Sequence, residues 1–218
     1  FRKDITMRKE ISVAILYSFD EKENNILFNE NMEETTAREE HINKRNEIKE
    51  EVKNLVWKNS DFYSEKNGRK IFDYLFDCAI DKAGEVYSWT EIYDWFCQFE
   101  EMVFESIKIF EIEVSRIENI HFDFNSPINL ENVDLDSYID RINNGENFDV
   151  VFDNFLTMIY NVSRFSKLSC GEKFHKIVIK NIDDIVYRFN DYHDIYNFAI
   201  WYSYFENIIA TSIEYALN

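Results

Sequence analysis

Hydrophobic residues along most of this chain recur every three or four positions, which is the spacing of an amphipathic helix. The pattern predicts helices over residues 36–58, 67–83, 88–115, 134–143, 148–166, 170–190 and 193–216. Thr36, Ser88 and Ser169 are each followed three residues later by Glu, the spacing of a capping box at a helix start. Gly84 and Gly145 each follow a predicted helix, where a left-handed glycine commonly ends it. The sequence shows no apparent internal repeat.

The N-terminal segment has a different pattern. Residues 11–19, ISVAILYSF, place hydrophobic side chains at alternate positions, which indicates a β-strand, with residues 26–28 as its return strand. A helix over residues 7–19 is the alternative. Hydrophobic residues also alternate over 120–124, which would allow a small sheet. The predicted fold class is therefore mainly α: a multi-helix, bundle-like domain with a short hairpin or sheet near the N-terminus.

The composition agrees with a helical fold. Only 4 Gly and 1 Pro occur in 218 residues, and so few breakers disfavour a turn-rich sandwich or barrel. We expect one domain over residues 1–218, with a subdomain boundary near 125–133, where Pro127 lies in the longest irregular connection. The segment 198–215 is apolar nearly all round, which predicts a helix at the centre of the core rather than in a subunit interface.

The formal net charge of −18 narrows the expected class of partner. Such a surface repels phosphates, which argues against conventional nucleic-acid binding. A basic protein partner, or mimicry of a nucleic acid, fits the sign, although acidity also serves solubility alone. The three cysteines form no C-x-x-C unit and no run of 18 apolar residues occurs, so we expect free thiols, a cytoplasmic location and no membrane span.

Two Glu-x-x-His pairs, Glu118/His121 and Glu172/His175, have the spacing found in di-iron helical bundles. Glu172 also belongs to a predicted capping box, and His121 lies in an alternating segment, so we expect no metal site. The four glycines are isolated, which disfavours a phosphate-cradling loop, and neither G-x-S-x-G nor H-E-x-x-H occurs. These patterns predict no cofactor.

The segment DDIVYRFNDYHDIYNF, residues 183–198, places Arg188 five positions before His193. This pair resembles the arginine–histidine signature of HEPN ribonucleases, and the resemblance implies metal-independent cleavage of RNA by these two residues. The residue after the arginine is usually polar in that family, whereas here it is Phe189. The pair also flanks a heptad-like seam, which favours a structural role. The seam consists of Val178, Ile182, Ile185, Phe189, Tyr192, Tyr196 and Ala199.

The acidic residues form two regular stripes along predicted helices. Charges spaced in this way share one helix face, where like charges repel unless a basic partner neutralises them. An ordinary solvated face is the alternative interpretation. The stripes consist of Asp73, Asp77 and Asp81 on one helix and of Asp94, Glu101 and Glu105 on the next.

These observations support three hypotheses of different classes. The first is a non-enzymatic acidic helical protein that stoichiometrically binds or inhibits a basic, nucleic-acid-handling protein through the two stripes, as immunity or phage anti-defence proteins do. The second is a HEPN-like ribonuclease that uses Arg188 and His193. The third is a structural or scaffolding subunit. On the first hypothesis the chain has no catalytic residue.

Overall fold

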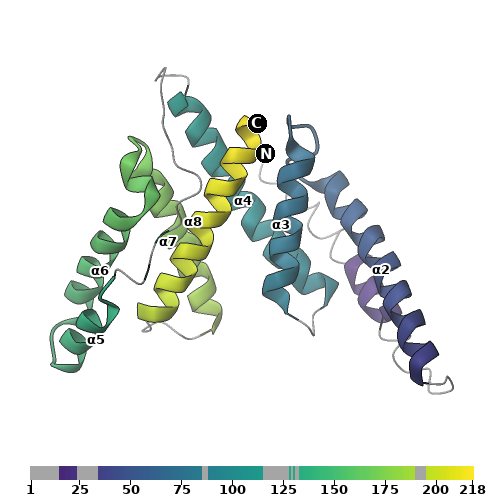
Figure 1. The fold of residues 1–218 in the computed structure, drawn as a ribbon, viewed down its shortest axis with the longest axis horizontal. Coiled ribbons are helices and arrows are strands. Elements are labelled where there is room, and N and C mark those ends of the chain that lie inside the picture. The colour runs from purple at the N-terminus through teal and green to yellow at the C-terminus, as the bar shows by residue number, and fades with distance from the viewer. Residues whose placement is uncertain are drawn as a thin grey trace. The chain divides into compact units, whose positions relative to one another are not determined.

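A computed structural model describes residues 15–23, 34–84, 88–114, 128, 130, 133–189 and 195–218 (Figure 1). Every regular element in these ranges is a helix, so the predicted mainly helical class is confirmed. After a helix over residues 15–23, the elements are α2 (Glu34–Asn59), α3 (Gly68–Ala83), α4 (Trp89–Val114), α5 (Leu135–Asn143), α6 (Phe148–Val162), the 3₁₀ turn η2 (Arg164–Lys167), α7 (Gly171–Phe189) and α8 (Ile195–Leu217).

The strand expected over residues 11–19 is wrong where the structure describes it, because residues 15–23 form a helix. Leu16 and Phe19 are buried three positions apart, whereas Tyr17 between them is exposed. Such a spacing places both buried side chains on one helical face. Asp20 then accepts hydrogen bonds from the backbone N–H of Trp89 and from Thr90, at the start of α4. The expected return strand at 26–28 and the alternation at 120–124 lie outside the described residues.

The expected helix starts were correct to within a few residues, and the serine half of the capping box expected at Ser88 is present. The Glu91 N–H donates to the Ser88 hydroxyl at 3.1 Å, directly before α4. Thr36 lies inside α2, and Ser169 lies two residues before α7. The helix expected over 148–166 is also divided, because Ser163 is extended (φ −66°, ψ 143°) and ends α6.

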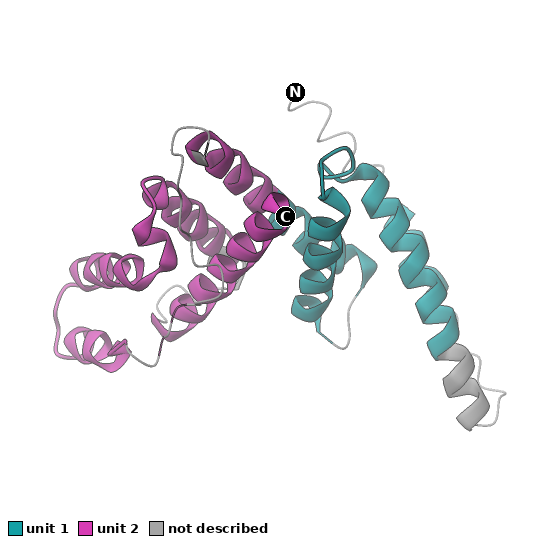
Figure 2. Ribbon diagram, turned by 45° about the horizontal axis from the view of Figure 1, so that its top comes forward, with its two compact units in different colours: residues 1–100 teal, residues 101–218 magenta. Residues whose placement is uncertain are grey.

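The chain separates into two compact units, residues 1–100 and 101–218 (Figure 2). Helix α4 begins in the first unit and ends in the second. The subdomain boundary expected near 125–133 falls in a segment that is largely outside the described residues, so it remains a prediction.

The first unit is built around aromatic residues of α2, α3 and α4. Phe72 of α3 lies with its ring centroid 5.1 Å from that of Trp57 in α2 and 5.1 Å from that of Phe96 in α4. Phe72 is fully buried and Phe96 nearly so, and aromatic pairs at this separation stabilise a core beyond their area alone. The three helices are therefore joined through contacts of tilted and edge-on rings.

The connection between α2 and α3 is fixed by a glutamate of α4. The Ser60 hydroxyl donates to Glu100 Oε1 at 2.5 Å, and the Asp61 N–H donates to the same oxygen at 2.9 Å. The Phe62 N–H in turn donates to the Ser60 hydroxyl oxygen at 3.1 Å. Gly68 closes the connection, since a Cβ there would lie 1.9 Å from the Phe62 carbonyl oxygen.

The second unit packs α5, α6 and α7 with α8. Helix α8 carries buried residues along nearly its whole length, which confirms the expectation that the C-terminal segment lies in the core. The heptad-like seam holds for Val178, Ile182 and Ile185, which are buried. It does not continue to Tyr196, which is 41% exposed, because α7 ends at Phe189 and α8 starts a new helix at Ile195.

No helix in the described ranges combines the length and the apolar character needed to cross a membrane. This agrees with the expectation from the sequence.

Candidate functional site: two acidic helix faces and a buried polar cluster

The acidic face of α3 consists of Asp77 and Asp81, which lie one turn apart and are both exposed. The opposite face of the helix buries Leu75, Phe76 and Ala79, and this burial directs the two carboxylates outward. Neither aspartate takes part in an ion pair or hydrogen bond with any described residue. The α3 face can therefore accept hydrogen bonds and charge from a group outside the described chain.

Asp73, the first member of the predicted stripe, has a different environment. Its carboxylate forms ion pairs with Lys53 of α2 at 3.0 Å and with Arg69 of its own helix at 3.1 Å. Arg69 also lies over the Trp57 ring, with its guanidinium carbon 5.2 Å from the ring centroid. Asp73 thus links α2 to α3 within the first unit.

The acidic face of α4 consists of Asp94, Glu101 and Glu105, all of which are exposed. Their spacing of seven and four residues keeps them on one side of the helix. None of the three forms an ion pair or hydrogen bond with the described part of the chain, and the same holds for Asp77 and Asp81 on α3. The structure therefore places five of the six predicted residues on solvent-exposed faces of two successive helices.

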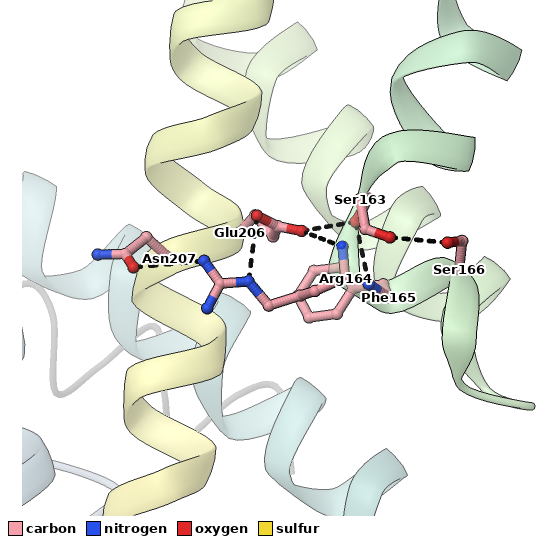
Figure 3. Close-up of polar contacts among 6 residues, drawn as sticks. All are labelled: Ser163, Arg164, Phe165, Ser166, Glu206 and Asn207. Atoms are coloured by element: carbon pink, nitrogen blue, oxygen red, sulfur yellow. Dashed lines mark hydrogen bonds and ion pairs between the residues drawn. The ribbon is translucent and has the colours of Figure 1, made fainter. Parts of the chain in front are cut away.

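A second group of polar residues, which sequence patterns did not indicate, is buried in the second unit (Figure 3). Glu206 of α8 is 0% exposed, and its Oε1 accepts hydrogen bonds from the Ser163 hydroxyl at 2.7 Å and from the Arg164 N–H at 2.8 Å. Its Oε2 lies 3.3 Å from Nε of Arg164, which is 4% exposed. Figure 3 shows the Arg164 side chain extending across α8 towards Asn207, whose Oδ1 lies 3.5 Å from Nη2.

The Glu206 carboxyl has a raised pKa because burial disfavours its charged form, and its hydrogen bonds and Arg164 counteract this shift. A buried carboxylate without a counter-charge would be strongly destabilising. The paired arrangement therefore holds the α6–α7 connection against α8, which is a structural role. The sequence does contain one signal for it: Glu206 is the only charged residue between Ile195 and Ile213.

His175 joins this cluster through Tyr202. The His175 Nδ1 lies 2.8 Å from the Tyr202 hydroxyl, and the ring of Tyr160 lies 4.9 Å away between centroids. Burial lowers the pKa of His175 and raises that of Tyr202. Glu172 is exposed at the start of α7, and the described residues contain no group of three or more His, Cys, Asp or Glu that could hold a metal ion. The other Glu-x-x-His pair, Glu118/His121, lies outside the described residues.

The arginine–histidine pair is only partly described. Arg188 lies near the end of α7, but its side chain is not described, and His193 lies outside the described residues. The HEPN-like hypothesis therefore remains a prediction.

Comparison with known proteins gave no match to a protein-family model, to a curated protein or to a solved structure. The function must therefore be inferred from the chain's own residues.

Proposed function

We propose that the protein is a non-enzymatic binding protein that docks a basic protein through the acidic faces of α3 and α4. The observation that carries this proposal is the set of five exposed carboxylates, Asp77, Asp81, Asp94, Glu101 and Glu105, none of which is paired with a described residue. Like charges at one-turn spacing repel one another within a helix. A lysine-rich or arginine-rich surface removes this repulsion on binding and accelerates association.

Asp73 is excluded from the docking set that we propose, although its stripe suggested it. Lys53 and Arg69 already neutralise its carboxylate, so a partner would have to displace two internal ion pairs to use it. The docking residues on α3 are therefore Asp77 and Asp81.

The net charge of −18 supports a partner of the opposite sign. Proteins that handle nucleic acids carry basic surfaces, so we propose a basic, nucleic-acid-handling protein in the cytoplasm as the partner. Stoichiometric inhibition of such a protein, as by an immunity or anti-defence protein, is the corresponding role.

The proposal is tested with a fluorescent lysine decamer, whose binding is measured by anisotropy at several salt concentrations. Changing the five docking carboxylates to Asn or Gln should weaken binding and make its salt dependence shallower. The matched control removes, by the same substitutions, five exposed carboxylates that lie outside the two acidic faces, at Glu47, Glu50, Glu51, Asp61 and Glu65. Equal weakening in both variants would show only a general effect of net charge and would contradict the proposal.

The partner itself can be identified by affinity purification from the native host followed by mass spectrometry. We expect a basic protein to co-purify in stoichiometric amount and to be lost in the docking variant but kept in the control variant. Metal-free RNA cleavage that disappears in His193→Ala would instead support the ribonuclease hypothesis.

A further inference from the structure

The connections that follow α2 and α6 have the same hydrogen bonds. In each, a serine hydroxyl donates to a glutamate Oε1, from Ser60 to Glu100 at 2.5 Å and from Ser163 to Glu206 at 2.7 Å. The next N–H donates to the same oxygen, at 2.9 and 2.8 Å. The N–H of the following phenylalanine then donates to the serine oxygen, at 3.1 Å in both units.

The backbone hydrogen bonds of the two connections match as well, although Asn67 is left-handed (φ 59°) and the equivalent Cys170 has no positive φ. From each serine, the same series of backbone hydrogen bonds leads through the phenylalanine to a glycine eight residues later. A Cβ on either glycine, Gly68 or Gly171, would lie 1.9 Å from the carbonyl oxygen of the phenylalanine, Phe62 or Phe165. Each glycine begins the next helix, α3 or α7, so the close approach of the two segments requires glycine in both units.

The ring contacts also correspond. In the first unit, rings of the three helices are in contact in the order Trp57, Phe72, Phe96, tilted or edge-on, with centroid separations of 5.1 Å and 5.1 Å. At the corresponding positions of the second unit, the tilted rings of Tyr160, His175 and Tyr202 have separations of 4.9 Å and 5.5 Å. The second unit thus keeps the three-ring contact but replaces two of its apolar rings by polar ones.

When the two glutamates are aligned, five residues of α4 are identical to those of α8. The segment WFCQFEEMVFESI in α4 corresponds to WYSYFENIIATSI in α8. The identical pairs are Trp95/Trp201, Phe99/Phe205, Glu100/Glu206, Ser106/Ser212 and Ile107/Ile213. A common type of turn could arise twice, but the turn does not by itself require a glutamate from the third helix, a three-ring contact and this pattern of identities.

We propose that the chain contains two copies of one three-helix module, α2–α3–α4 and α6–α7–α8, in which a glutamate of the third helix fixes the connection between the first two. Glu100 and Glu206 are the positioning residues of the two copies. The hydroxyls of Ser60 and Ser163 connect each glutamate to the backbone N–H of the following phenylalanine. Gly68 and Gly171 allow the start of the next helix to approach the carbonyl of that phenylalanine. Helix α5 has no counterpart in the first module.

The two copies carry different residues at corresponding exposed positions. If the protein docks a basic partner as proposed above, this difference indicates which copy the partner contacts. In α7, Lys180 occupies the position of Asp77, whereas Asp184 keeps the acid found at Asp81. In α8, the three docking carboxylates of α4, Asp94, Glu101 and Glu105, are replaced by Ile200, Asn207 and Thr211, so four of the five docking carboxylates have no acidic counterpart. Docking of a basic partner through these faces therefore belongs to the first copy.

The duplication is tested by exchanging residues 62–68 (FYSEKNG) with residues 165–171 (FSKLSCG) in the full chain, in each direction separately and in both. Residues 60, 61, 163 and 164 stay in place, so that Glu206 keeps its arginine. We expect each chimaera to unfold cooperatively, with a melting temperature lowered by at most about 8 °C. Scrambled inserts of the same composition should abolish cooperative unfolding. Chimaeras as unstable as the scrambled ones would overturn the proposal.

A double-mutant cycle provides a second measurement that needs no chimaera. Ser60→Ala with Glu100→Gln, and Ser163→Ala with Glu206→Gln, should each give non-additive shifts in melting temperature. Coupling in only one unit would overturn the shared role of the two glutamates. Both tests measure stability, so they remain decisive even if no basic partner exists.

The location of docking is tested with the lysine decamer used above. Asp77→Asn with Asp81→Asn in the first copy should weaken binding severalfold. The second-copy variant Lys176→Gln with Lys180→Gln should leave binding unchanged or strengthen it. Weaker binding in the second-copy variant alone would overturn the assignment of docking to the first copy.

Discussion

The two glutamate-fixed connections differ in how they compensate a carboxylate in the interior. Glu206 is fully buried and has Arg164 as its counter-charge, whereas the equivalent Glu100 is only half-buried and Asp61 occupies the position of the arginine. Moving a carboxylate out of water costs several kcal/mol unless a charge and hydrogen bonds replace the water. The same backbone contacts therefore occur with an acidic residue after the serine where the glutamate is half-buried, and with an arginine there where the glutamate is fully buried.

The largest expected difference between the units concerns the residue after the serine. Arg164→Ala should destabilise the protein by about 3–5 kcal/mol, because it leaves a buried carboxylate without a counter-charge. Asp61→Ala, the matched change in the first unit, should alter stability by no more than about 0.5 kcal/mol, since its side chain is exposed. Urea denaturation of both variants measures the difference, and equal losses would show that Arg164 does not act through Glu206.

The pH dependence of the Arg164→Ala variant sharpens this comparison. Glu206 has a raised pKa in the folded protein, so the folded state takes up a proton more readily than the unfolded state as the pH falls towards the ordinary glutamate value. Protonation removes the unpaired charge. We therefore expect the Arg164→Ala defect to shrink on acidification, and Arg164→Ala combined with Glu206→Gln to show a smaller defect at neutral pH.

Replacing either glycine, Gly68 or Gly171, by alanine should destabilise the protein by a similar amount, in contrast to the unequal effects expected for Arg164→Ala and Asp61→Ala. Gly68→Ala and Gly171→Ala each bring a Cβ to within 1.9 Å of a backbone carbonyl oxygen, which only a backbone shift can relieve. Each should cost about 1–3 kcal/mol or more, as overpacking of a close contact does. Thermal unfolding of the two variants measures this, with Gly84→Ala as a control for a glycine required by its positive φ of 81° rather than by close contact.

Removing the serine hydroxyl should lower stability more in the second unit than in the first. Ser163→Ala removes both a donor to Glu206 and the acceptor of the Phe165 N–H in a fully buried setting, so we expect a loss of about 1–3 kcal/mol. Ser60→Ala removes the same two bonds beside the half-buried Glu100 and should cost less. A larger loss for Ser60→Ala, measured by denaturation, would contradict the difference in burial that separates the two connections.

Among the contacts that the two units share, the smallest effect is expected at the three rings. His175→Phe gives the second unit the residue that the first unit has at Phe72, and it should cost about 0.5–1.5 kcal/mol because it removes the hydrogen bond with the Tyr202 hydroxyl. Because burial lowers the folded-state pKa of His175, the unfolded state binds its proton more readily. The parent protein should therefore lose stability as the pH falls through and below about 6.5, and His175→Phe should reduce this loss. Melting temperatures across this pH range provide the test.

The sequence by itself determined the helices of this protein. Periodic hydrophobic positions and the shortage of glycine and proline predicted α2 to α8 nearly within their observed bounds, because these are local properties of the chain. The same patterns placed Asp77, Asp81 and the α4 carboxylates on exposed faces. They failed at residues 15–19, where alternation and helical spacing coexist and where tertiary burial of Leu16 and Phe19 accompanies the helix.

Only the tertiary structure showed the repeated module and its polar contacts. Ser60 and Glu100 are 40 residues apart and Ser163 and Glu206 are 43 apart, so no local pattern connects them. Few residues are identical between the copies, because an apolar core accepts many side chains of suitable size, whereas the fixed connection depends on one serine, one glycine and one distant glutamate. Folding brings these residues together, and the contacts they then make distinguish Glu206, Asp73 and His175 from other residues of the same type.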